Sequence, residues 1–183
     1  RPLTDHDVQL LFKNDYRSAE GKGSVILSKV GFGGKTGIDV EAGSTGNVTL
    51  TYEVPQDGSI AAGGGIKVIR KHGGGNWQWS PAQIADSNQP RYATFELHPT
   101  GSNKTHPEGH LKCYPNDLRL GSANDCYFTL TNGVLLPGDK VVFNFERLRA
   151  AGTAAKVPNT QFTVAVDRGG SPGGFFYELP EEP

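Results

Sequence analysis

The stretch Asn47-Val48-Thr49-Leu50-Thr51-Tyr52-Glu53-Val54 decides the fold class of this 183-residue chain. From residue 48 to residue 54 every second residue is apolar, and the residues between them are threonine or glutamate. This period of two predicts a β-strand with one buried face. Turn-forming residues at 43–46 and 55–58 bound the stretch. The chain is therefore expected to contain a sheet that is covered on one side.

Other segments repeat this pattern of β-branched and aromatic residues between turn signals. They are residues 66–70, 92–97, 127–131, 140–146 and 161–167, with weaker candidates at 7–12 and 25–30. No run of ten residues has a helical pattern, and residues 147–155 are interpreted as a connection between strands. The sequence predicts an all-β fold, an antiparallel β-sandwich of about eight or more strands, immunoglobulin-like or jelly-roll-like.

A chain of this length is expected to form one domain, because a single sandwich or barrel uses 183 residues. We assign residues 21–180 to the sandwich, residues 1–20 to an N-terminal arm or edge strand, and residues 181–183 to a tail. The chain begins at Arg1 and contains no Met, so we expect a processed or excised piece.

Charge and hydropathy disfavour two classes of partner. The 18 basic and 19 acidic residues give a formal net charge of −1, which provides no basic field for nucleic acid. The apolar runs are far shorter than the roughly 18 residues that span a bilayer. We therefore expect neither nucleic-acid binding nor membrane insertion.

The two cysteines, Cys113 and Cys126, enclose a polar segment rich in turn residues. We predict a disulfide between them, which indicates a secreted, extracellular or periplasmic protein. The alternative is a pair of buried thiols in a reducing compartment. Asn47 and Asn103 each begin an Asn-x-Thr sequon and are candidates for glycosylation.

Several short motifs resemble a known family when they are taken in order. They are Val40-Glu41-Ala42-Gly43-Ser44-Thr45-Gly46, the run from Gly58 to Val68, the pair Trp77 and Trp79 before Pro90-Arg91-Tyr92, and Gly133-Val134-Leu135-Leu136-Pro137-Gly138-Asp139. They are similar to the N-terminal β-sandwich of an uncharacterised family of large, mostly bacterial proteins. The downstream part of that family resembles a metal-dependent hydrolase of the polymerase-and-histidinol-phosphatase type. The metal-binding residues of that family belong to its downstream part, so the resemblance implies no metal-binding residue in this chain.

A glycine-rich segment at 73–75 precedes Asn76, Trp77 and Trp79. In an extended loop the two tryptophans point to the same side, where they form a stacking platform for a sugar ring or an apolar side chain. We predict a ligand-binding site here, with His72 and Tyr92 as neighbours. The alternative is that one or both tryptophans close the end of the sandwich.

His106 and His110 lie near Cys113, and a helix would place these two histidines on one face for zinc. Pro107 and Gly109 disrupt that geometry, so a solvated loop is the preferred interpretation. We expect no cofactor, while zinc at the histidines, or calcium at loop carboxylates that include Asp139, remains open.

The sequence contains no Gly-x-Ser-x-Gly motif, and the Gly63-Gly64-Gly65 run lacks the lysine of a phosphate-binding loop. We therefore predict a non-catalytic extracellular binding or accessory module, with carbohydrate as the candidate ligand. The alternative is a self-assembling structural subunit of a filament or surface layer, in which residues 5–12 add a strand to another copy. A metal-dependent enzyme ranks third. The expected partners are carbohydrate or another protein, including copies of the chain itself.

Overall fold

The computed structural model describes residues 23–34, 41–70, 80–113, 125–150, 162–169 and 176–180. Within these ranges the regular structure is β-strand, apart from a short 3-10 turn, η1 (Phe32–Gly34). The strands are β1 (Ser24–Gly31), β2 (Thr45–Glu53), β3 (Ile60–Ala61), β4 (Gly65–Arg70), β5 (Ala93–His98), β6 (Glu108–Cys113), β7 (Asp125–Asn132), β8 (Val134–Leu135), β9 (Lys140–Arg149), β10 (Phe162–Asp167) and β11 (Phe176–Pro180). No helix in the described part of the chain is long and apolar enough to cross a membrane.

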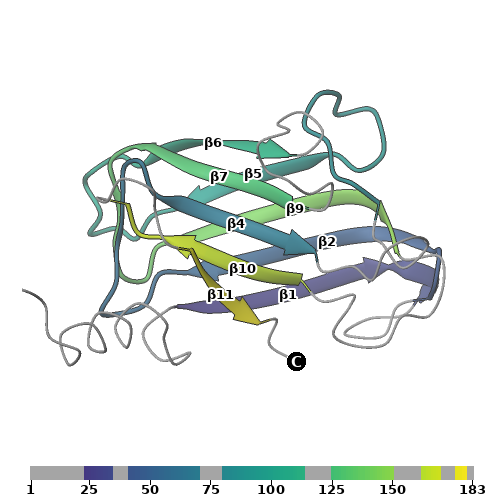
Figure 1. Cartoon of the computed structure of the whole chain (residues 1–183), viewed down its shortest axis with the longest axis horizontal. Helices are drawn as coiled ribbons and strands as arrows, with labels where there is room; N and C mark the ends of the chain where they lie inside the picture. Colours follow the sequence, from purple (N-terminus) through teal and green to yellow (C-terminus); the bar gives the residue numbers. More distant parts are fainter. Residues whose placement is uncertain are drawn as a thin grey trace, which may run out of the picture.

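The strands form two main sheets, and all named strands that pair do so antiparallel. The four-stranded sheet has the order β1-β2-β9-β5, and the five-stranded sheet has the order β11-β10-β4-β7-β6. Figure 1 shows both sheets face on, with β6, β7, β4, β10 and β11 following one another from top to bottom. The short strands β3 and β8 form a separate pair. The prediction of an antiparallel β-sandwich is confirmed.

Aromatic side chains join the two sheets in the core. The ring of Phe128 on β7 lies with its centroid 4.9 Å from that of Phe95 and 6.4 Å from that of Phe143, both on the four-stranded sheet. The rings of Phe145 and Phe162 make a second contact between the sheets, at 6.2 Å. Tilted and edge-on pairs at these distances are favourable for aromatic rings, so the contacts fix how the sheets stack.

Two sequence predictions fail at strand ends. The segment of His106 and His110 was expected to form a solvated loop, but Glu108–Cys113, which includes His110, is β6, an edge strand of the five-stranded sheet. Residues 147–155 were expected to connect strands, but β9 continues to Arg149. The pairing of β9 with β2 shifts register between Gly46 and Val48, and Arg147 takes φ 51° there. This bulge accommodates the extra residue and lets the strand continue.

A buried carboxylate holds one end of the sandwich together. Asp139, just before β9, is fully buried. Its Oδ1 accepts a hydrogen bond from the backbone N–H of Thr100 at 2.7 Å, and its Oδ2 accepts one from the backbone N–H of Leu136 at 2.8 Å. The side-chain amide of Asn103 also donates to Oδ2. Asp139 therefore ties the loop after β5 to the turn before β9.

Candidate functional site

The predicted tryptophan site lies outside the described residues, as do Asn76, Trp77, Trp79 and His72. The described residues on either side of this segment are Arg70, at the end of β4, and Ser80. The backbone N–H of Ser80 donates to the carbonyl of Arg149 at 3.0 Å, on the four-stranded sheet. The described residues that flank the segment therefore lie on β4 and beside β9, and the role of the segment in binding stays a prediction.

Tyr92, the remaining member of that predicted site, is described and half-buried. Its carbonyl accepts a hydrogen bond from the backbone N–H of Glu146 at 2.9 Å, which places it beside β9. The next residue, Ala93, is buried in the core, so the side chain of Tyr92 points to the outer side of the four-stranded sheet.

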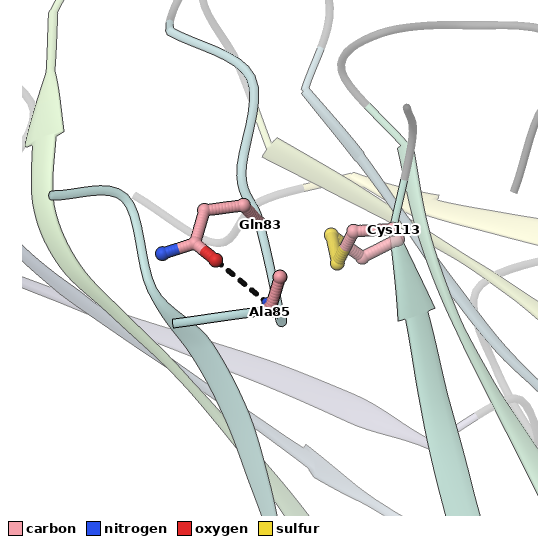
Figure 2. Close-up of a disulfide and its surroundings, with 4 residues drawn as sticks. Gln83, Ala85 and Cys113 are labelled. Carbon is pink, nitrogen blue, oxygen red and sulfur yellow. Dashed lines mark hydrogen bonds between the residues drawn. A yellow bond between two sulfur atoms is a disulfide. The ribbon is translucent and has the colours of Figure 1, made fainter. Parts of the chain in front are cut away.

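The predicted disulfide is confirmed. Cys113 on β6 and Cys126 on β7 are directly opposite each other, with Cα atoms 4.1 Å apart and a bond between their sulfur atoms. Both side chains are fully buried. Figure 2 shows the bond beside the segment of Gln83 and Ala85, where the Gln83 side-chain oxygen accepts from the Ala85 N–H at 2.7 Å. The bond therefore fixes edge strand β6 to the sheet.

An aromatic side chain lies on the outer face of the five-stranded sheet, on β7, the strand next to the edge strand β6. Lys67 on β4, Tyr127 on β7 and Lys112 on β6 are cross-strand partners in one row. The residues on either side of each along its strand are buried in the core, so these three side chains point outward. A Cβ atom on Gly65 would lie 2.9 Å from Cε2 of Tyr127. The tyrosine ring therefore lies over Gly65, in space that a side chain there would fill.

The hydroxyl end of Tyr127 points along the strand towards Thr129 and Asp167. Partial burial raises the pKa of Tyr127, the nearby Asp167 carboxylate raises it further, and a side-chain hydrogen bond with Thr129 works in the opposite direction. Thr129 pairs with His110 on β6 and with Gly65 on β4, so a second row lies beside the first. We name this set the Tyr127 platform; its members are Lys67, Tyr127, Lys112, Thr129 and His110.

The outer face of the four-stranded sheet is different in character. Ser28, Thr49, Asn144 and Thr94 form one row of small polar residues across its four strands. Its described charged groups include the exposed pairs Lys140 with Glu53, at 3.5 Å, and His98 with Glu96, at 3.0 Å. Exposed pairs of this kind contribute little to stability. This face carries hydroxyl groups and carboxylates but lacks a central aromatic ring in the part that the structure describes.

The histidines predicted as candidate metal ligands are both exposed. His106 lies in the loop before β6, and His110 lies on the outer face of β6. Cys113 is bonded to Cys126 and offers no thiolate. Within the described ranges no group of three or more His, Cys, Asp or Glu side chains is arranged to hold a metal ion.

The two glycosylation candidates differ in environment. Asn103 is buried, and its side-chain nitrogen donates to the carbonyl of Val134 at 2.9 Å and to Asp139. A glycan on that nitrogen would have to occupy the protein interior. Asn47 is exposed, and its side-chain oxygen accepts from the backbone N–H of Arg147 at 2.9 Å. Glycosylation of Asn47 stays a prediction, whereas the burial of Asn103 argues against a glycan there in the folded protein.

Comparisons with known proteins give distant structural neighbours, two matching chains in all. No protein-family model and no curated protein match the chain. A solved structure, the CBM3a-L domain with flanking linkers from the scaffoldin cipA of the cellulosome of Clostridium thermocellum, is similar with a TM-score of 0.33 and 12% sequence identity. The alignment covers 87% of this chain and 98% of that chain. The candidate site therefore rests on the residues of this chain.

Proposed function

We propose that this chain is a non-catalytic carbohydrate-binding module and that the Tyr127 platform is its binding surface. The observation that supports this is the ring of Tyr127 over Gly65, on the outer face of the five-stranded sheet. An aromatic ring offers an apolar surface to the C–H face of a sugar. The neighbouring hydroxyl of Thr129 and the ammonium groups of Lys67 and Lys112 supply hydrogen-bond partners for sugar hydroxyls.

The side chains of the Tyr127 platform project from a rigid part of the sheet. Its members lie on three adjacent strands, and the buried Cys113–Cys126 bond joins two of these strands. Side chains on strands are positioned more tightly than those on loops, so little conformational entropy is lost when a ligand binds. The segment that carries Trp77 and Trp79 leaves β4 at Arg70, roughly 10 Å along the strand from Lys67. The tryptophans are therefore candidates for a second contact with the same ligand.

We also propose a secreted or periplasmic location, because buried disulfides such as Cys113–Cys126 form and persist in oxidising compartments. The resemblance to the front sandwich of larger proteins fits an accessory domain and stays a prediction.

Affinity electrophoresis through gels that contain different soluble polysaccharides tests the proposed site. We expect one polysaccharide to retard the wild-type chain and Tyr127→Ala to weaken that binding at least about tenfold, which corresponds to about 1.4 kcal/mol. Tyr127→Phe keeps the ring and should bind nearly as well. The matched control is Tyr92→Ala, on the other sheet. Loss of binding in the control and not in Tyr127→Ala would place the contact elsewhere.

A second function, self-assembly through strand addition, is favoured by the edge strand β1. Ile26 and Val30 on β1 are 60% and 61% exposed, and among the described strands β1 has a neighbour in its sheet on one side only. One feature of β1 opposes this function: Lys29 points inward and is only 6% exposed, and an inward charge on an edge strand discourages pairing. The arm that would add the strand, residues 5–12, lies outside the described residues. If the full chain sediments as a monomer at high concentration, self-assembly is ruled out.

A further inference from the structure

We infer that Asp167 contacts the ligand of the Tyr127 platform and selects a neutral polysaccharide by accepting hydrogen bonds from sugar hydroxyl groups. This inference rests on the proposed function and names its ligand class and a residue that determines specificity. Asp167 is only 9% exposed, and its Oδ1 accepts a hydrogen bond from the Gly169 N–H at 2.9 Å. Its Oδ2 accepts no hydrogen bond from the part of the chain that the structure describes. A buried carboxylate oxygen of this kind needs a hydrogen-bond donor.

The strand register places Asp167 next to the Tyr127 ring. Asp167 pairs with Gly65 on β4, and Gly65 pairs with Thr129 on β7. Val166 belongs to the core, so Asp167, the next residue on β10, faces the outer side of the sheet. Neighbouring strands are about 4.8 Å apart, so the backbones at Asp167 and Thr129 are roughly 10 Å apart. The glycine between them has no side chain, and the Tyr127 ring lies over it. The ring and the carboxylate therefore border the same part of the surface.

The electrostatic environment of Tyr127 agrees with this placement. Partial burial raises the pKa of Tyr127, and the Asp167 carboxylate raises it further, while the hydrogen bond of the tyrosine is with Thr129. The carboxylate is therefore close to the hydroxyl end of the ring. A sugar that stacks on the ring has its hydroxyl groups at its rim, within reach of Oδ2. Hydrogen bonds to a charged acceptor are about twice as strong as neutral ones, so this contact favours a ligand rich in donors.

The charges on this face favour a neutral ligand. Lys67 and Lys112 lie on the outer face, and both already interact with other groups of the protein. By strand register, Asp125 and Glu178 lie on the same face. The face therefore carries both signs of charge and exerts no net attraction on an acidic polymer. A carboxylate on the sugar would be repelled by Asp167, whereas a hydroxyl group donates to it.

A comparison of neutral and acidic polysaccharides tests the ligand class without any mutation. Affinity electrophoresis would use galactomannan, xyloglucan and mixed-linkage glucan as neutral probes and polygalacturonate as the acidic probe. We expect a neutral polymer to bind and polygalacturonate to bind about tenfold more weakly or not at all. Equal or tighter binding of polygalacturonate would overturn the inference and leave the carbohydrate-binding proposal standing. If none of these polymers binds, the inference fails, and a wider panel of polysaccharides decides the broader proposal.

The variant Asp167→Asn tests the residue itself. It keeps an oxygen for the Gly169 N–H and replaces the other oxygen with a nitrogen that cannot accept a hydrogen bond. Isothermal titration calorimetry should show an affinity for the neutral polymer that is lower by about tenfold or more. The matched control, Glu108→Gln, removes the same charge from an exposed residue roughly 13 Å along β6 from Lys112, the partner of Tyr127, and should change the affinity less than about twofold.

Circular dichroism would establish that Asp167→Asn folds. Unchanged affinity in the folded variant contradicts the inference, and if Tyr127→Ala still loses binding, the platform proposal is unaffected. If Asp167→Asn does not fold, the comparison of polymers decides.

A last pair of variants separates a direct contact from an effect through Tyr127. Tyr127→Phe keeps the ring and removes the hydroxyl group that lies close to the Asp167 carboxylate. If Asp167 touches the ligand, Asp167→Asn should weaken binding by the same factor in the Tyr127→Phe background as in the wild type. A loss that disappears in that background would refute the inference, because Asp167 would then act only through the Tyr127 hydroxyl.

Discussion

Replacing Asp139 with alanine removes an acceptor that three donors share. Its two carboxylate oxygens accept from the backbone N–H groups of Thr100 and Leu136, at 2.7 and 2.8 Å, and from the side-chain amide of Asn103. The carboxylate is fully buried. After the change these donors lose their partner at a site that the folded chain shields from water. We therefore expect the loop after β5 to lose its attachment to the turn before β9.

The size of the effect follows from those hydrogen bonds. A buried donor left without a partner costs about 1–3 kcal/mol, and the costs of neighbouring donors do not add fully, so Asp139→Ala should lower the free energy of unfolding by about 4 kcal/mol. Asp139→Asn keeps one oxygen acceptor and should lower it by about 2 kcal/mol. Natural domains have only about 5–15 kcal/mol of stability, so either loss is large.

Urea unfolding at neutral pH, followed by circular dichroism, measures these differences. The matched control is Asp86→Asn, because exposed Asp86 also accepts from a backbone N–H, that of Asn88 at 2.9 Å. The control should change the free energy of unfolding by less than about 0.5 kcal/mol. The reasoning is wrong if Asp139→Ala stays within about 0.5 kcal/mol of the wild type, or if Asp139→Asn behaves like the control.

Three further predictions concern the disulfide, a buried tyrosine and the glycine under the platform. Replacing both Cys113 and Cys126 with alanine should lower the free energy of unfolding by about 3 kcal/mol in urea, and an unchanged unfolding midpoint would contradict this. Burial raises the pKa of Tyr52 above that of an unfolded chain, while the nearby Arg168 guanidinium opposes the shift, so its contribution to stability is full below about pH 10 and is lost as the pH rises further. Melting temperatures measured in alkaline steps should therefore fall less in Tyr52→Phe than in the wild type, and parallel curves would refute the assignment. Gly65→Ala places a methyl group 2.0 Å from a backbone oxygen and should lower the free energy of unfolding, measured in urea, by about 2 kcal/mol or more. In the control Gly101→Ala the added methyl group meets nothing within 4 Å, so the free energy of unfolding should hardly change. Equal effects of the two changes would contradict the close packing at Gly65.

Local patterns were sufficient to predict the fold class. The alternation in residues 47–54 predicts the buried face of β2 because a strand in a half-covered sheet must separate apolar from polar side chains. β6 was missed because one of its three inward positions is Gly109, and with so few apolar residues the alternation is weak. Residues 108–113 form a strand because they pair with β7, and this pairing cannot be deduced from the residues of the segment alone.

The Tyr127 platform could not be predicted because it depends on register between strands far apart in the sequence. The alternation of 127–131 indicates that Tyr127 faces away from the core. It does not show that Gly65 lies beneath the ring or that lysines flank it, because those neighbours follow from the pairing of β4 and β6 with β7. Within the Gly63-Gly64-Gly65 run, Gly63 takes a positive φ in a turn, whereas Gly65 begins β4, and the glycine pattern alone does not separate these two roles. The disulfide was predictable because both cysteines bound one short polar segment.

The central claim, that the Tyr127 platform binds carbohydrate, is tested most directly by nuclear magnetic resonance. Titrating the isotope-labelled full chain with an oligosaccharide of the polymer that binds it shows which amide signals shift. The account predicts that the largest shifts fall on β4, β6 and β7, around Lys67, Lys112 and Tyr127. Shifts confined to the four-stranded sheet, or to residues 71–79 alone, would contradict it.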